Sequence, residues 1–169
     1  MQKSHKKITD GISLKGQLVV TLETCRDKDG RFLPKHLRKR EVHRYNNLVV
    51  TAGRTSIANH LTAGSPSPSA LRVTFVALGT GVVAPANSDT TLGTEVYRKA
   101  TASAANTANV ATVTGFFTQT ETTGTYREAG LFMGGTIAAN SGTLLSRVAI
   151  NITKTAIQTL TIEWTITIS

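Results

Sequence analysis

The chain has 169 residues, a formal net charge of +9 and 28 threonines, but only 17% charged and 5% aromatic residues. No run approaches the roughly 20 apolar residues that a membrane helix needs, so no contact with a membrane is expected. The single cysteine, Cys25, excludes intrachain disulfides and thiolate-rich metal sites. Because threonine is β-branched and suits the solvent face of a pleated strand, the composition favours an all-β domain with many turns.

The positive charge is concentrated near the N-terminus. Residues 1–44 hold twelve Lys/Arg against five Asp/Glu, a net charge of +7, whereas residues 45–169 hold seven against five, a net charge of +2. We therefore expect two parts: an extended basic N-terminal arm over residues 1–44, with one strand-like segment, and a β-sandwich body over residues 45–169.

The strand-like segment of the arm shows alternation with a period of two, which is typical of a half-buried strand. Its apolar face consists of Ile12, Leu14, Leu18, Val20 and Leu22. Asp29 and Gly30 then form a pair suited to a tight reversal, because both tolerate positive φ. The following residues, 31–44, are strongly basic.

The body begins with a short apolar run at residues 47–50. Ile57 and Leu61, four apart, predict one short amphipathic helix over residues 53–62. Pro and Gly predict a loop over residues 63–70. Apolar side chains on both faces then favour a central strand at 71–78, and Gly, Pro, Asn and Asp predict a long surface loop at 79–91.

Five further strands are expected, and the last alternates most clearly, with Leu, Ile and Trp opposite Thr and Glu. They lie near residues 95–102, 110–120, 126–133, 144–153 and 159–168. About eight strands with a turn every ten or so residues predict a mainly antiparallel β-sandwich or Greek-key barrel.

No pattern in the sequence points to catalysis. All four histidines lie in the first 60 residues, and Ser56 with His60 has no acidic residue nearby in sequence to complete a triad. Asp27, Asp29 and Gly30 match only a fragment of a calcium loop. We therefore expect no enzyme activity, no catalytic residue, no cofactor and no bound metal.

Five short motifs in the body occur in an order that resembles structural proteins of tailed bacteriophages. They are Val-Ala-Leu-Gly-Thr-Gly at 76–81, Ala-Pro-Ala at 84–86, Thr-Leu-Gly-Thr-Glu-Val-Tyr-Arg at 91–98, Arg-Glu-Ala-Gly-Leu-Phe at 127–132 and Gly-Thr-Leu-Leu-Ser-Arg at 142–147. The order is similar to that in the N-terminal collar modules of phage tail fibres. With Asn-Leu-Val-Val-Thr-Ala-Gly at 47–53, it also resembles small virion-associated proteins.

The resemblance implies a non-enzymatic virion subunit, assembled in the bacterial cytoplasm and present in several copies beside other virion proteins. A fibre carries a long shaft after this module, whereas this chain stops after its last strand. That difference favours a tail-side adaptor or collar protein, with a capsid decoration (cement) protein as the alternative.

Four charged residues within these motifs have a structural interpretation. Glu95 and Arg98 are three apart, and Glu128 and Arg147 lie on strands that we expect to be neighbours. An inter-strand ion pair, or a carboxylate that accepts hydrogen bonds from loop amides, would fasten the 79–91 loop to the sheet.

The basic residues before the body have three possible roles. They are Lys35, Arg38, Lys39, Arg40 and Arg44. They either contact a neighbouring virion protein, which we favour, or bind nucleic-acid phosphate without reading sequence, or form a solvated charge run that keeps the subunit soluble.

Overall fold

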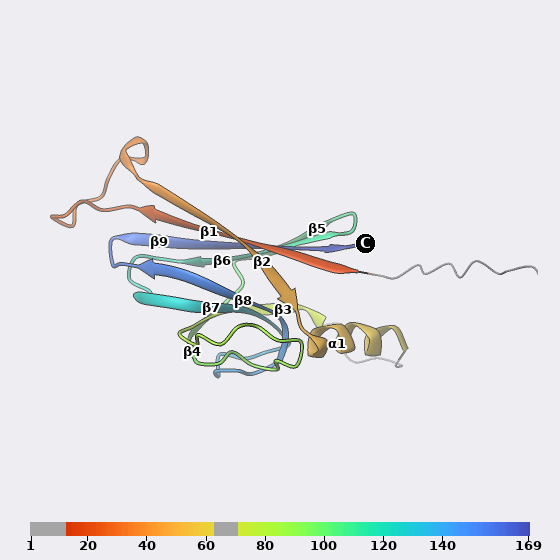
Figure 1. Ribbon diagram of the computed structural model, residues 1–169. Coiled ribbons are helices and arrows are strands. Elements are labelled where there is room, and N and C mark those ends of the chain that lie inside the picture. Colours follow the sequence, from red (N-terminus) through yellow and green to blue (C-terminus); the bar gives the residue numbers. More distant parts are fainter. Residues whose placement is uncertain (1–12, 63–70) are drawn as a thin grey trace, which may run out of the picture.

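The computed structural model describes residues 13–62 and 71–169 (Figure 1). Within these residues the chain is mainly antiparallel β, with nine strands and one α-helix. The helices are α1 (Thr51–Thr62) and the short 3-10 helix η1 (Lys35–Leu37). The strands are β1 (Leu14–Thr24), β2 (Arg40–Val49), β3 (Val73–Gly79), β4 (Glu95–Ala100), β5 (Ser103–Thr107), β6 (Val110–Phe117), β7 (Gly124–Met133), β8 (Thr143–Lys154) and β9 (Gln158–Ile168).

The strands form one curled sheet in the order β4-β3-β7-β8-β2-β1-β9-β6-β5. Strand β2 joins its two halves. It pairs with β1 along Arg40–Asn47 but with β8 only at Leu48 and Val49. We call β2, β1, β9, β6 and β5 the β1 half, and β4, β3, β7 and β8 the β7 half. The predicted mainly β fold is thus confirmed. The sandwich or Greek-key arrangement is not confirmed, and the extended basic arm is not confirmed either.

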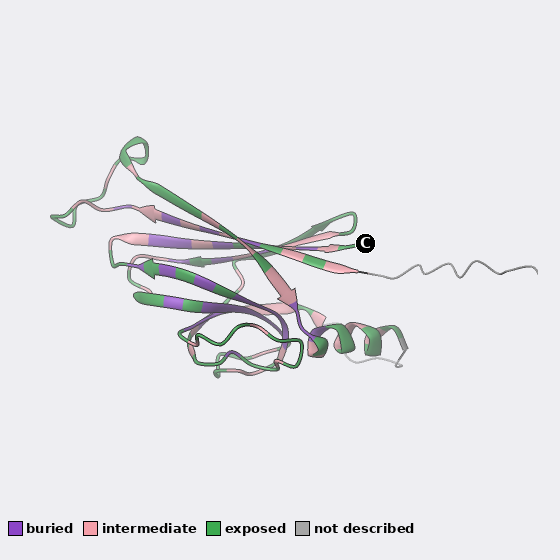
Figure 2. Ribbon diagram, viewed as in Figure 1, coloured by how far each residue is buried: buried purple, intermediate pink, exposed green. Residues whose placement is uncertain are grey.

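The two halves face each other across the main hydrophobic core. A second, smaller cluster of buried residues is separate from it and consists of Val50, Ala77, Leu92, Phe132 and Leu144. Inward-facing side chains of β1, β6 and β9 pack against those of β3, β7 and β8, and Trp164 is fully buried among them. The ring of Tyr97 on β4 lies edge-on to Phe117 on β6, with centroids 5.9 Å apart. Figure 2 shows buried residues along the strands and exposed ones over most of the connection between β1 and β2. Each fully buried aliphatic or aromatic side chain contributes about 1.5–3 kcal/mol.

The predicted boundary after Arg44 falls inside β2, and β1 lies within the sheet between β2 and β9. Residues 14–24 and 40–44 therefore belong to the same sheet as the rest, whereas the connection between them, residues 25–39, does not. The alternation of β1 arises because Leu18, Val20 and Leu22 face the core. No alternation marks β2, because over most of its length it pairs only with β1 and both of its faces are largely polar.

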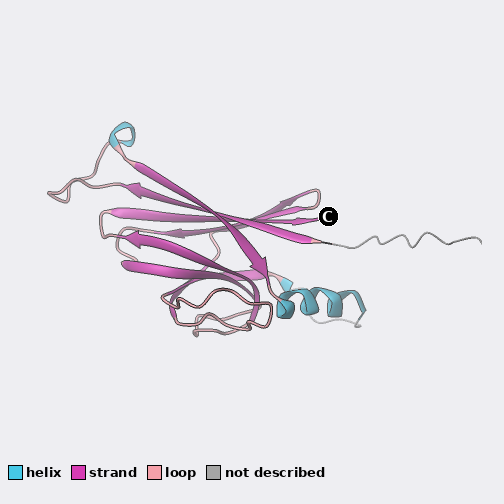
Figure 3. Cartoon of the chain, viewed as in Figure 1, coloured by secondary structure: helices cyan, strands magenta, loops and turns pink. Residues whose placement is uncertain are grey.

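The other elements lie close to their predicted places. Helix α1 begins at Thr51, directly after the buried Val50, and packs so closely on β8 that Gly53 lies against the backbone of Leu145 (Figure 3). Strand β5 was not predicted, since all five of its residues are exposed. The predicted loop at 63–70 lies outside the described residues.

Candidate functional site

A buried carboxylate of β7 holds both ends of the β3–β4 connection, residues 80–94. Glu128 is 1% exposed. Its Oε1 accepts hydrogen bonds from the backbone N–H groups of Gly81 (3.0 Å) and Thr94 (2.7 Å), and its Oε2 accepts one from Gly93 (3.0 Å). At Gly81 a side chain has no room, because a Cβ there would collide with Glu128 Oε1. Three amides from the two ends of the loop thus meet at one carboxylate.

Arg147 of β8 ties the same carboxylate to the middle of that loop. Its Nη2 lies 2.7 Å from Glu128 Oε2, and its Nη1 donates to Asp89 Oδ2 at 2.6 Å. Nη2 also donates to the carbonyl oxygen of Val83 at 3.0 Å. Glu128 and Arg147 were predicted to lie on neighbouring strands, and the structure brings them together. It adds Asp89, which no motif had marked as a partner.

The electrostatics of this cluster keep it charged. Burial raises the pKa of Glu128, but the N–H groups of Thr94 and Gly93 and the guanidinium of Arg147 outweigh burial and hold that pKa below its ordinary value. The pKa of Asp89 is lowered in the same way, by the Ala86 N–H and by Arg147 against the effect of burial. Burial alone would lower the pKa of Arg147, yet its two carboxylate partners raise it.

A second buried ion pair holds the β7–β8 connection, residues 134–142. Arg98 of β4 forms a bidentate pair with Glu95, through Nε–Oε1 (2.5 Å) and Nη2–Oε2 (2.8 Å). Its Nη1 donates to the carbonyl oxygens of Thr136 (2.9 Å) and Ser141 (3.0 Å), and its guanidinium lies over the ring of Phe132. Both charged side chains are 3% exposed or less. The Glu95–Arg98 pair was predicted to fasten the 79–91 loop, but its loop contacts are with residues 134–142 instead.

The two loops are connected, and we call residues 80–94 and 134–142 together the loop platform. The N–H of Leu92 donates to Asn140 Oδ1, and the N–H of Asn140 donates to Glu95 Oε2. Apolar side chains nevertheless project from the platform into solvent: Val82 is 81% exposed, Val83 72% and Ile137 81%. The platform therefore carries exposed apolar side chains on loops that buried ion pairs hold in place.

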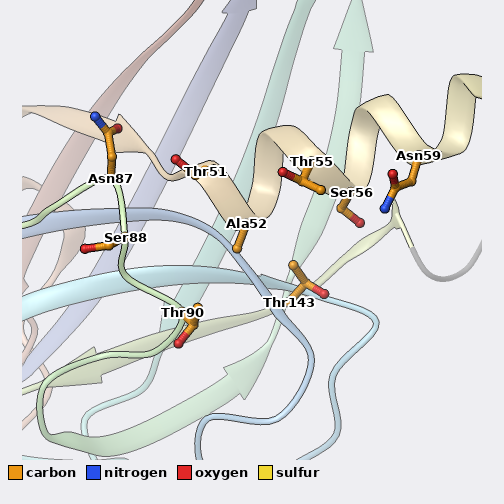
Figure 4. A pocket seen from close by; sticks show the side chains of 9 residues that line it. All are labelled: Thr51, Ala52, Thr55, Ser56, Asn59, Asn87, Ser88, Thr90 and Thr143. Atoms are coloured by element: carbon orange, nitrogen blue, oxygen red, sulfur yellow. The ribbon is translucent and has the colours of Figure 1, made fainter.

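A hollow of about 410 Å³, lined by small side chains, lies between α1 and the platform (Figure 4). Its walls carry hydroxyl, amide and methyl groups, contributed by Thr55 and Ser56 of the helix and by Asn87 and Thr90 of the loop, among others. No charged or aromatic side chain lines it. The hollow therefore offers hydrogen bonds but no acid, base or stacking surface.

The predicted partner-binding residues lie elsewhere, around the β1–β2 connection. We call this connection, residues 25–39, the basic hairpin; it extends beyond the rest of the sheet (Figure 1). Lys35 lies on η1 and Lys39 follows it; both are exposed, as is Arg44 on β2. Arg38 and Arg40, in contrast, each lie within 4 Å of Glu23, at 3.8 and 3.6 Å. Lys28 and Arg31, which were not among the predicted partner-binding residues, are exposed on the same hairpin.

No family model matches this chain, and no match was found among curated proteins or solved structures. In residues 13–62 and 71–169 no group of three or more His, Cys, Asp or Glu side chains is placed to hold a metal ion. No helix in the same part of the chain combines the length and the hydropathy needed to cross a membrane.

Proposed function

We propose that this chain is a non-enzymatic structural subunit of a tailed-bacteriophage particle, namely a tail-side adaptor or collar protein in several copies. The proposal is supported by the position of the phage-like motifs, which lie together in the structure. Residues 76–81, 91–98, 127–132 and 142–147 supply the groups that hold the loop platform: Gly81, Gly93, Thr94, Glu95, Arg98, Glu128 and Arg147. The residues that resemble docking modules are thus the ones that fix an exposed apolar surface.

The placement of charge also favours a binding role. The side chains of Glu95, Arg98, Glu128 and Arg147 are each 3% exposed or less and are bound to one another or to loop backbone. Their chemistry is used to position a loop, and none of the four presents a titratable group to a substrate.

The platform and the basic hairpin lie at different ends of the molecule (Figure 1). One subunit therefore has two separate surfaces, one apolar and one basic, for two neighbours. Contact with two different neighbours is what an adaptor requires.

The test uses particles of the phage that encodes the chain. Mass spectrometry of purified particles gives its copy number relative to the major capsid protein, and cryo-electron microscopy gives its position. We expect a few copies per particle, at the tail. Absence from purified particles would overturn the proposal, and a copy number similar to that of the capsid protein would assign the chain to capsid decoration.

Platform variants test the docking surface itself. We expect V82S/V83S/I137S to fold normally and to be lost from particles, because only exposed side chains are changed. The matched control is Leu61→Ser on α1, where a side chain that is 78% exposed lies away from the platform. Equal incorporation of both variants would show that the platform is not the docking surface.

A further inference from the structure

The basic hairpin is an ordered structure with its own hydrogen bonds. Leu33 N–H donates to the carbonyl oxygen of Cys25 at 2.8 Å, and Asp27 N–H donates to that of Arg31 at 3.0 Å. Asp27 Oδ1 accepts the N–H groups of Asp29 and Arg31, both at 2.9 Å, which closes the turn. The hairpin therefore presents its side chains from a defined backbone.

Most of its positive charge has no ion-pair partner among residues 13–62 and 71–169. Residues 25–39 hold six Lys/Arg and two Asp/Glu. Among the described residues, no ion pair is formed by Lys28, Arg31, Lys35 or Lys39, and all four are exposed. Like charges held close together repel each other, and an oppositely charged surface relieves that repulsion.

A second copy of this chain supplies too little negative charge for that purpose. Asp89 and Glu128 are bound to Arg147, Glu95 is bound to Arg98, and Glu121 to Lys99. In the body, residues 45–169, this leaves one carboxylate without an ion pair, that of Glu163 on β9. Of the other described carboxylates, Glu23 lies near Arg38 and Arg40, and Glu41 binds His43. Asp27 and Asp29 belong to the hairpin itself. The balance of charge therefore favours a different molecule as the partner.

The hairpin also carries two exposed apolar side chains, Phe32 (64% exposed) and Leu37 (57%). The guanidinium of Arg26 lies over the Phe32 ring, 3.7 Å from its centroid. Aromatic and Arg side chains are enriched at the centres of protein–protein interfaces.

The carboxylates of Asp27 and Asp29, at the tip, argue against nucleic acid. A phosphate backbone is negative throughout and would repel them. A protein surface can instead place donors opposite these carboxylates and acidic groups opposite the lysines.

We infer that the basic hairpin binds a neighbouring virion protein whose surface has a carboxylate-rich rim around an apolar hollow. The hollow takes Phe32 and Leu37, and the rim pairs with the exposed Lys and Arg side chains. This inference rests on the proposed function and adds the chemistry of one partner.

The experiment compares particles assembled with three variants. K28Q/R31Q/K39Q removes three charges from the hairpin, and F32S/L37S removes its apolar side chains. The matched control, K15Q/R72Q/R127Q, removes three exposed charges elsewhere. Urea denaturation of each purified chain establishes that it is folded, and mass spectrometry gives copies per particle.

We expect each hairpin variant to show about tenfold fewer copies per particle, equivalent to a loss of about 1.4 kcal/mol of binding, and the control to match the wild type. Carbodiimide cross-linking of wild-type particles should join Lys28, Lys35 or Lys39 to acidic residues of another virion protein. Normal incorporation of both hairpin variants would overturn the inference and leave the proposed function standing.

Two other outcomes also count against the inference. If the wild-type chain is absent from particles, the proposed function fails and the inference fails with it. The second outcome combines three results: the chain binds a duplex DNA probe, K28Q/R31Q/K39Q abolishes that binding, and DNA-free particles no longer retain the chain. Together these results would show that the hairpin binds nucleic acid instead.

Discussion

The substitution Glu128→Gln tests whether one buried carboxylate organises the platform. Glutamine keeps the shape and one acceptor oxygen, but its NH₂ group replaces an oxygen that accepts hydrogen bonds from Gly93 and Arg147. It also leaves the Arg147 guanidinium with Asp89 as its remaining carboxylate partner. Removing one partner of a buried ion pair costs about 3–5 kcal/mol, so we expect the free energy of unfolding to fall by about 4 kcal/mol.

The assay is urea denaturation followed by fluorescence, because Trp164 is the single tryptophan and is fully buried. A loss of that size lowers the melting temperature by roughly 8–15 °C in a chain of this length. The control is Glu163→Gln, the same change on an exposed side chain, which should stay within about 0.5 kcal/mol of the wild type. If both variants unfold at the same urea concentration, Glu128 does not hold the platform.

The pH dependence gives an independent check. Because the pKa of Glu128 in the folded chain is below its ordinary value of 4.5, its stabilisation is complete above pH 4.5 and is lost as the pH falls through the folded-state pKa. Asp89, whose ordinary pKa is 3.8, behaves in the same direction. The gap in stability between the wild type and Glu128→Gln should therefore narrow below pH 4.5. A gap that is constant at all pH values would contradict the assignment.

Three further predictions concern other parts of the fold. Arg98→Lys should lower the free energy of unfolding by about 2 kcal/mol and make the 134–142 loop susceptible to protease, because an ammonium group cannot form the bidentate pair and also bind two carbonyl oxygens. Arg127→Lys, at an exposed site, should change neither the stability nor the rate of proteolysis. Gly53→Ala should lower the free energy of unfolding by about 1–3 kcal/mol, measured by urea denaturation, because the new Cβ would lie 2.7 Å from a backbone oxygen of β8. Alanine has the higher helix propensity, so Thr55→Ala on the exposed side of the same helix should be neutral or stabilising. The Cys25 thiol, 2% exposed, should react with a thiol reagent only after urea unfolds the chain, and rapid reaction of the native protein would contradict its burial.

The sequence predicted strands where one face is buried and the other is not. β1 and β9 alternate because they lie inside the sheet and cover the core. β2 and β5 gave no such signal, since β5 is an exposed edge strand and β2 is polar on both faces over most of its length. Periodicity records burial, so a strand that buries few side chains leaves little trace in it.

The candidate site was partly predictable for a different reason. Glu128 and Arg147 lie in compact motifs on strands that proved to be adjacent, so their meeting follows from the order of the strands. Asp89 and Asn140 come from loops, where no period marks which side chain turns inward. Their roles depend on how the two loops fold back onto the sheet, and local sequence does not encode that path.

The pairing of β1 with β9 has a consequence for how the chain folds. Leu14 lies opposite Ile168, so a strand near the start of the chain pairs with one near its end. The β1 half cannot be completed until β9 has been synthesised and has emerged from the ribosome. Contacts between residues so distant in sequence also form slowly. Charged side chains on an unpaired strand discourage edge-to-edge aggregation, so the charged residues of β2 protect the β1–β2 ribbon during that delay.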